Sequence, residues 1–356
     1  MANPDLLALT AELVDIASES HAEQAITDHL EGELRALGHL EVERVGDNLV
    51  ARTQLGRGTR VVLAGHTDTV PANGNAAARI DGDVLWGLGA ADMKGGVAVH
   101  LALARALAEP AVDVTYVFYA GEEVAAEHNG LGHLVRERPE LVAGDVALLG
   151  EPTGGELEAG CQGTMRLEVR LRGQRAHTAR PWTGRNAVHR LGALLREVEA
   201  FPERRPVIDG CEYREALSAV FVEGGVAGNV VPDLATVTLN RRFAPDRTKD
   251  EAVAEMEALL VPLLEDGDEV AVVDIAEGAR PGLDHPVLQR LVRHHGLAVS
   301  AKLGWTDVAR FAQLGIPACN LGPGDALLAH QAEERVSRAA LDRTYEVLLE
   351  VLQAPV

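Results

Sequence analysis

Aromatic residues make up only 3% of this 356-residue chain, so aliphatic side chains and alanine must fill its core. Cysteine is almost as scarce, and the three that occur lie far apart, at Cys161, Cys211 and Cys319. That number and that spacing exclude a disulfide framework and a zinc finger. We expect all three to be small buried side chains in a protein of the reducing cytoplasm.

The chain also lacks an early positive charge and a long apolar segment. Its first basic residue is Arg35, so the sequence shows no positively charged region of a secretory signal. The longest apolar run, near residues 97–108, contains His100 and Arg105 and is too short and too polar to span a bilayer. The sequence therefore predicts a cytoplasmic protein that makes no use of a membrane.

Positive charge is in deficit overall. The 33 basic residues, nearly all of them arginine, stand against 54 acidic ones and leave a formal net charge of −21. A chain this acidic is a poor partner for nucleic acid or for an anionic membrane surface. It also repels anionic substrates at long range, so an anionic substrate would need arginines close to its binding site.

The length predicts about two domains, at roughly 150 residues for each. Buried strands alternate with helices at both ends of the chain, which predicts an α/β domain with a largely parallel sheet over residues 1–161 and 280–356. Ser20 and Glu23 predict a capping box at the start of one early helix. The main strands expected in this domain are 40–45, 48–54, 60–64, 113–119 and 145–149, with a helix at 93–107.

Residues 162–279 have a different pattern. Residues 164–172 alternate between apolar and polar side chains, which is typical of a half-exposed strand. The segment therefore predicts an inserted α+β domain with an antiparallel sheet and two helices. Its other expected elements are strands near 217–222, 233–242 and 269–275 and helices near 184–201 and 249–264.

Acidic residues and histidines gather where the predicted strands of the α/β domain end, and the carboxyl edge of a parallel sheet is where such proteins place their sites. Taken singly, each has an ordinary alternative. In these alternatives, the pair His66-Thr-Asp68 would be a surface turn and Asp92 would cap a helix. The Glu122–Glu123 pair would lie in a solvated loop, and a lone His330 would be structural or exposed. A further carboxylate, Glu151, also follows a strand.

Together these segments supply two histidines and three carboxylates, namely His66, Asp92, Glu123, Glu151 and His330. One bridging carboxylate, with one histidine and one carboxylate for each metal, is typical of a co-catalytic pair of divalent ions. Nitrogen and oxygen ligands favour zinc, with cobalt or manganese as substitutes, so we expect two Zn²⁺ per subunit. An additional glutamate that binds no metal would take a proton from the attacking water.

In order and spacing, the segments GHTDTVP, GAADMKGG, GEE, GEP and the late AH resemble the M20 metallopeptidases over nearly the whole chain. The resemblance implies that the inserted domain is a lid and a dimer interface, so that the protein is a homodimer. It also implies that His66 and Glu151 bind one zinc, that Glu123 and His330 bind the other, and that Asp92 bridges them.

The resemblance implies roles for five more residues. Asp68 would orient the first ligand histidine, and Glu122 would be the general base and then the acid for the leaving amine. His177 would reach into the partner subunit's site and donate to the oxyanion, although a surface histidine at a strand end is the alternative. Asn229 and Arg242 would contact the substrate, although Asn229 also suits a plain turn after glycine.

Further segments, among them GCQGTMRLEVRLRGQRAHTAR and GPGDALLAHQAEE, resemble family members that act on a small succinylated molecule. The resemblance implies cleavage of N-succinyl-LL-2,6-diaminopimelate to succinate and LL-diaminopimelate, a step of lysine biosynthesis. A succinyl carboxylate needs a cation, and the candidates are Arg175, Arg180, Arg185, Arg242 and Arg280, with Arg242 the first choice.

Some positions depart from the family pattern. Ala176 stands where glycine is usual, no arginine pair precedes Gly163-Thr164, and the pattern near Thr306-Asp307 is shifted by one residue. Two alternatives therefore stay open. One is another hydrolase of the family, such as an acetylornithine deacetylase or a small-peptide peptidase. The other is a non-catalytic homologue that only binds a ligand, which would have no use for a general base.

Overall fold

The computed structural model describes residues 4–355, and its contacts divide the chain into two compact units. Unit 1 is formed by Met1–Gly160, Pro281–Ala301 and Thr306–Val356, as far as these are described. Unit 2 is formed by Cys161–Arg280 and Lys302–Trp305. The short segment Lys302–Trp305, which we expected in the α/β domain, thus packs with the inserted segment instead.

Unit 1 is built on an eight-stranded sheet with the order β1-β2-β6-β3-β7-β16-β8-β15. The strands β6, β3, β7 and β16 run parallel to one another, whereas β1, β2 and β8 each run antiparallel to a neighbour. The predicted largely parallel sheet is therefore confirmed. The strands are β1 (Glu41–Val45), β2 (Asn48–Arg52), β3 (Arg60–His66), β6 (Asp113–Tyr119), β7 (Val146–Leu149), β8 (Leu157–Ala159), β15 (Val299–Ala301) and β16 (Ala318–Asn320).

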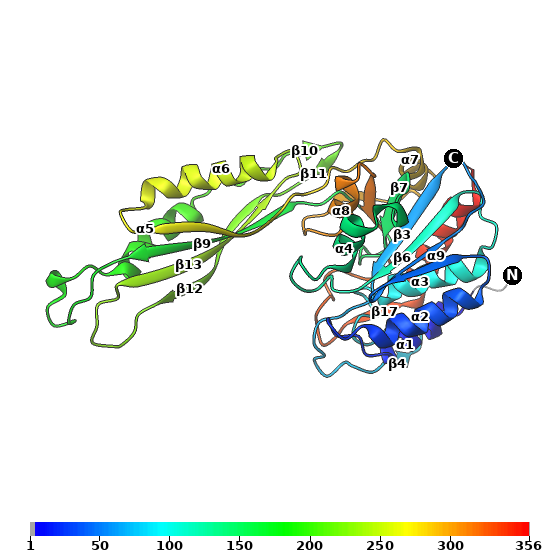
Figure 1. Ribbon diagram of the computed structural model, residues 1–356, viewed down its shortest axis with the longest axis horizontal. Helices are drawn as coiled ribbons and strands as arrows, with labels where there is room; N and C mark the ends of the chain where they lie inside the picture. The colour runs from blue at the N-terminus through cyan, green and yellow to red at the C-terminus, as the bar shows by residue number, and fades with distance from the viewer. Residues whose placement is uncertain (1–3, 356) are drawn as a thin grey trace. The chain divides into compact units, whose positions relative to one another are not determined.

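Helices cover this sheet (Figure 1), and a small sheet of order β17-β5-β4 packs against α1 and α9. The helix α3 packs on β3 and also contacts α1, α2 and α9, while α8 packs on β7 and β16. No helix within residues 4–355 is long and apolar enough to cross a membrane. The elements are α1 (Leu6–Asp15), α2 (Gln24–Ala36), β4 (Arg79–Asp81), β5 (Val84–Trp86), α3 (Lys94–Ala106), α4 (Gly130–Glu137), α7 (Pro286–His295), α8 (Val308–Gln313), β17 (Arg335–Ser337) and α9 (Arg338–Gln353).

A glycine contact brings the start of α3 against the end of β7. A Cβ atom added at Gly96 would lie only 2.3 Å from the carbonyl oxygen of Gly150, so only glycine allows this close approach. The residues just before α3 and just after β7 are therefore held near each other. This contact between helix and sheet is what positions two of the predicted metal ligands.

The predicted capping box at Ser20 and Glu23 is wrong. The helix α2 begins at Gln24, and its cap residue makes no side-chain hydrogen bond to the helix. The Glu23 carboxylate instead accepts the backbone N–H of His21 at 3.0 Å, and the Ser20 hydroxyl donates to the Asp68 carboxylate at 2.8 Å. Ser20 thus binds Asp68, which is distant in the sequence, instead of the nearby helix. A local sequence pattern cannot reveal such a partner.

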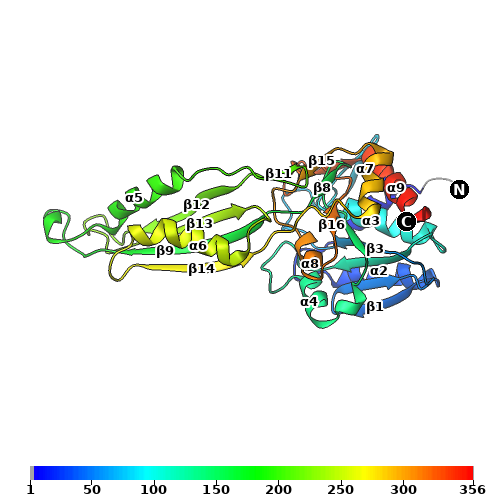
Figure 2. The same ribbon diagram turned by 90° about the horizontal axis from the view of Figure 1, so that it is seen from above.

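Unit 2 is an antiparallel sheet of order β12-β13-β9-β14 with two long helices, α5 and α6 (Figure 2). In β9 the apolar residues are buried and alternate with partly or fully exposed ones, as the sequence predicts. Buried side chains of β9, β13, α5 and α6 form its core. The main elements are β9 (Gly163–Arg172), α5 (Ala187–Glu199), β12 (Ala216–Gly224), β13 (Leu234–Phe243), α6 (Lys249–Leu260) and β14 (Glu269–Ala276).

A buried histidine makes the stability of unit 1 depend on pH. His100 in α3 is 1% exposed, and its Nδ1 atom has no hydrogen-bond partner among the described residues. Burial lowers the pKa of His100 to about 3, so the folded protein keeps the ring neutral, whereas the unfolded chain protonates it near pH 6.5. Above pH 6.5 this histidine does not lower the free energy of unfolding. Below pH 6.5 it lowers the free energy of unfolding increasingly as the pH falls toward 3.

We expect the substitution His100→Leu to flatten the acid side of the stability profile. Between pH 7 and pH 5, the wild type should lose about 2 kcal/mol of unfolding free energy more than the variant, at 1.36 kcal/mol for each pH unit below 6.5. Urea unfolding of chelator-treated protein at both pH values measures this. The exposed His133→Leu serves as the control and should follow the wild type. Parallel profiles for wild type and His100→Leu would contradict the prediction.

Candidate metal centre

Three neighbouring parallel strands end at the same edge of the sheet, and each is followed by a predicted site residue. His66 is the last residue of β3, Glu122 and Glu123 follow the end of β6, and Glu151 follows the end of β7. Because β6, β3 and β7 are adjacent and parallel, their carboxyl ends bring these side chains to one place.

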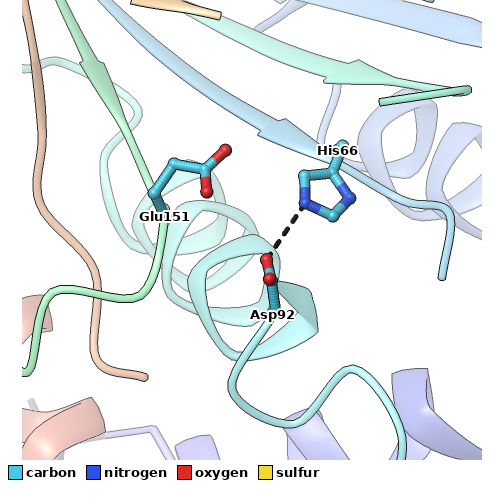
Figure 3. Close-up of side chains that lie close together, drawn as sticks. All are labelled: His66, Asp92 and Glu151. Atoms are coloured by element: carbon cyan, nitrogen blue, oxygen red, sulfur yellow. Dashed lines mark hydrogen bonds and ion pairs between the residues drawn. The ribbon is translucent and has the colours of Figure 1, made fainter. Parts of the chain in front are cut away.

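Asp92 lies two residues before α3 and meets the side chains from the sheet. Figure 3 shows His66 and Glu151 reaching toward it from β3 and from the end of β7. The Asp92 Oδ1 atom is 3.2 Å from His66 Nε2. One ligand atom of each of the three residues lies within 4.8 Å of the others, and both His66 and Glu151 are buried.

A second group shares the same aspartate. Asp92, Glu123 and His330 also place one ligand atom each within 4.8 Å of one another. The His330 Nε2 atom lies 2.8 Å from Glu123 Oε1 and 3.6 Å from Asp92 Oδ2. Asp92 therefore directs one carboxylate oxygen toward each histidine, which is the arrangement of a carboxylate that bridges two ions.

The donors in these groups fit divalent cations. All are imidazole nitrogens or carboxylate oxygens, the ligand types that zinc, cobalt and manganese accept. Burial raises the pKa of Glu123, since its charged form is poorly solvated there. The pKa of His66 is also raised, because the Asp68 and Asp92 carboxylates outweigh the lowering by burial. Crowded carboxylates of this kind are costly without a cation between them, and the structure thus contains groups able to hold metal ions.

Asp68 fixes the loop that carries the two adjacent glutamates. Its Oδ1 atom accepts the backbone N–H of Glu122 at 3.0 Å, and its Oδ2 atom accepts the N–H of Glu123 at 3.1 Å and the hydroxyl of Ser20. The Nδ1 atom of His66 lies 3.1 Å from the Asp68 carbonyl and 3.6 Å from its carboxylate. Although burial opposes it, these donors and the His66 ring lower the pKa of Asp68 to about 2.

Glu122 stands beside both groups of ligands. It shares with His66 and Glu123 a third group whose ligand atoms lie within 4.8 Å of one another, and it is partly exposed. Its desolvated position, with Glu151 and Asp307 nearby, raises its pKa well above the usual value for a glutamate. A carboxyl group that stands beside the ligand atoms and can both take up and release a proton suits acid–base catalysis.

His177 and Asn229 lie together in unit 2, on two neighbouring segments. The backbone N–H of Thr178 donates to the carbonyl of Asn229 at 3.1 Å, and His177 forms a β-bridge with Val230. Both side chains are exposed, and His177 Nδ1 accepts the N–H of Ala179 at 3.0 Å. Nothing within unit 2 buries this pair, so both residues are available to a ligand.

Arg242 lies at the other end of β13. Asn229 lies before the first residue of that strand, Leu234, whereas Arg242 is the last residue but one. The strand from Leu234 to Arg242 is about 27 Å long at 3.4 Å per residue, so it separates Asn229 from Arg242. Arg242 is partly buried and donates to Asn240 Oδ1 at 3.2 Å. It makes no ion pair with the described residues, whereas three other candidate arginines bind acids: Arg175, Arg185 and Arg280. Arg180 is exposed.

Two buried acids near the ligands were not found by the sequence analysis. Asp307 accepts two hydrogen bonds from Asn129 Nδ2, at 2.9 and 3.1 Å, and one from Arg310 Nε at 3.2 Å. Glu334 accepts backbone hydrogen bonds from the loop that contains Asp92. Asp307 lay in a segment to which we assigned no role beyond a substrate-pocket loop. The one signal for Glu334 was its place four residues after a predicted ligand histidine.

Comparisons with known proteins identify relatives over most of the chain. The sequence model of peptidase family M20/M25/M40 matches residues 62–354. A Mycobacterium tuberculosis protein named as a succinyl-diaminopimelate desuccinylase is 53% identical over 335 residues, which cover 93% of each chain. The succinyl-diaminopimelate desuccinylase of Corynebacterium glutamicum is 48% identical and covers 93% of this chain and 91% of its own.

Solved structures share the fold. A tripeptidase from Staphylococcus aureus superposes with a TM-score of 0.80 at 23% identity, covering 98% of this chain and 97% of its own. A dinuclear metal-binding peptidase from Bacillus subtilis superposes with a TM-score of 0.73 at 16% identity, covering 98% and 96%. At these identities the likeness concerns the architecture alone.

Proposed function

The chain belongs to peptidase family M20/M25/M40, and we propose that it hydrolyses N-succinyl-LL-2,6-diaminopimelate to succinate and LL-diaminopimelate. The observation that carries this proposal is the 53% identity, over 93% of both chains, to a protein named as a succinyl-diaminopimelate desuccinylase. The product is a precursor of lysine, so the reaction belongs to lysine biosynthesis. We place it in the cytoplasm, in keeping with three cysteines that form no disulfide.

The ligand groups suit two divalent ions, which we propose to be zinc. His66 and Glu151 would hold one ion, Glu123 and His330 the other, and Asp92 both. Such a pair, when bound, polarises the amide carbonyl and lowers the pKa of water. The shared use of Asp92, with one oxygen toward each histidine, supports two sites rather than one.

The protein's own groups would move the protons of the reaction. Glu122 takes a proton from water on its carboxylate and later gives it to the nitrogen of the leaving amine. Asp68 holds the backbone of Glu122 and of Glu123 through both of its oxygens, so the base and a ligand keep a fixed spacing. His177 would donate a hydrogen bond to the oxygen of the tetrahedral intermediate.

Two features of unit 2 support a homodimer in which each lid completes the partner's site. The strand β12 is an edge of its sheet and exposes Val220, Phe221 and Val222, by 46%, 69% and 54%. An apolar edge strand is a template for pairing with another chain. In addition, His177 and Arg242 are too far apart in one unit 2 for both to touch one small substrate, so two subunits would have to supply them.

Sedimentation equilibrium of the full chain tests the assembly. We expect a dimer for the wild type and a shift toward the monomer for Phe221→Glu, because the charge would be buried in the pairing edge. The matched control is Val207→Glu, which changes a residue of the same unit that is 66% exposed. A monomeric wild type, or equal behaviour of the two variants, would rule out this interface.

Arg242 is the arginine that we expect to bind the succinyl carboxylate. The substitution Arg242→Met should raise KM for the succinylated substrate by about 10- to 100-fold, the loss expected for a charge-assisted hydrogen bond of 1.5–3 kcal/mol. Turnover of an N-acetyl amino acid, which lacks that carboxylate, should change far less. Steady-state kinetics on both substrates measure this, with the exposed Arg180→Met as the control. An equal loss on both substrates would assign Arg242 a structural role.

The substrate itself is tested by release of free amine from N-succinyl-LL-2,6-diaminopimelate. Chelator-stripped protein with zinc restored is assayed beside N-acetylornithine and a dipeptide panel at equal concentrations. We expect a zinc-dependent preference for the succinyl substrate of about 100-fold or more, equal to about 2.7 kcal/mol of transition-state discrimination. Turnover of the acetyl or peptide substrates instead would reject the proposed substrate. Zinc binding without any turnover would favour a non-catalytic homologue.

A further inference from the structure

We propose that Glu334 is a positioning residue that holds the backbone of Asp92 in place and thereby sets the affinity of both metal sites. This inference rests on the proposed metal function of the ligand groups. It concerns a residue whose carboxylate belongs to none of the ligand groups found among the described residues.

The contact is made by one buried carboxylate oxygen. Glu334 is 1% exposed, and its Oε1 atom accepts the backbone N–H of Ala91 and the backbone N–H of Asp92, both at 3.0 Å. Burying a carboxylate is costly, and hydrogen bonds from two peptide groups repay part of that cost. The buried Glu334 carboxylate therefore holds the loop that carries Asp92.

Asp92 lies in the loop before α3, two residues before the helix begins. Its two oxygens must face His66 and His330, at 3.2 and 3.6 Å. Ligand sets work only within about 0.5 Å and 10–20° of their ideal geometry, so a fixed backbone at this residue matters for both ions.

The same residue links the Asp92 loop to the turn that carries His330. Glu334 follows His330 by four residues, and its carbonyl accepts the N–H of Gly87 at 3.1 Å. Its next residue, Arg335, pairs with Trp86 where β17 joins β5. These backbone contacts join the segment before the Asp92 loop to the end of the His330 turn. The Glu334 side chain then binds the backbone of Asp92 itself.

Metal titration of three variants tests the proposal. Isothermal titration of Zn²⁺ into chelator-stripped protein gives the affinities, and the visible absorption of bound Co²⁺ reports the ligand geometry. We expect Glu334→Ala to weaken both sites by about 10- to 100-fold, as is usual for a residue that orients a metal ligand, and to alter the cobalt spectrum. Glu334→Gln keeps an oxygen acceptor for both N–H groups and should recover most of the affinity. The exposed neighbour Glu333→Ala is the control.

Each result decides the matter. Wild-type affinities and an unchanged cobalt spectrum in Glu334→Ala would overturn the proposal. An equally large loss in Glu334→Gln would overturn the hydrogen-bond account, and this variant carries the test if the alanine variant fails to fold. A wild-type protein that binds no metal would instead defeat the proposed metal function, so the two failures are distinguishable.

Discussion

The Glu122→Gln protein is expected to cleave its substrate about 10³-fold more slowly than the wild type while it binds metal ions with unchanged affinity. The amide keeps the size of the side chain but has no basic oxygen to take a proton, and general acid–base catalysis contributes about 10²- to 10⁴-fold. Glu122 lies beside His66 and Glu123 but belongs to neither of the two groups that share Asp92. Its loss should therefore affect the chemical step and spare the sites themselves.

Turnover number, KM and metal affinity are measured on the same preparations. The expected pattern is a fall in turnover number with KM and both metal affinities near their wild-type values. Glu127→Gln is the matched control, because it makes the same change in the same loop on a side chain that is 79% exposed. Loss of one metal ion in Glu122→Gln would show that this residue is a ligand, and normal turnover would remove it from the mechanism.

The strands and helices that lead to the site could be predicted because their patterns are local. The buried strands β3, β6 and β7 are mostly apolar, and the alternation in β9 marks a sheet with one covered face. Short elements such as β4 and β5 were not predicted, because three residues carry too little periodicity to register. The strand β5 pairs with β17, which lies some 250 residues further along the chain, and β4 pairs with β5.

The site residues divide in the same way. Ligand types can be read from the sequence because a histidine or acid at a strand end has few other uses when several occur together. The buried polar groups around them could not be predicted, because Ser20, Asp307 and Glu334 form hydrogen bonds with partners far along the chain. A local rule even gave the wrong partner for Ser20, whose hydroxyl binds the Asp68 carboxylate instead of capping a helix.

Asp92→Asn should have the broadest effect of any single substitution in the site, because both ligand groups use this side chain. The amide offers one neutral oxygen where the carboxylate offers two charged ones, so it can no longer face both histidines with an oxygen. The site that meets the amide nitrogen would keep only one histidine and one glutamate, and the other would have a neutral oxygen in place of a charged one. Both sets are too weak for a tight zinc site. Turnover should fall below about one-thousandth of the wild type, equal to about 4 kcal/mol.

The comparison that isolates bridging is Glu123→Gln, since Glu123 belongs with His330 to only one of the two groups that share Asp92. Metal content after dialysis should be two ions for the wild type and one for Glu123→Gln, whereas Asp92→Asn should retain neither. Zinc should also raise the Tm of the wild type but leave that of Asp92→Asn unchanged, because an ion stabilises only a fold that binds it. Asp81→Asn, which changes an aspartate that is 78% exposed, controls for the charge. If Asp92→Asn kept one ion as tightly as Glu123→Gln, Asp92 would serve a single site, and the two metal sites would have to be independent.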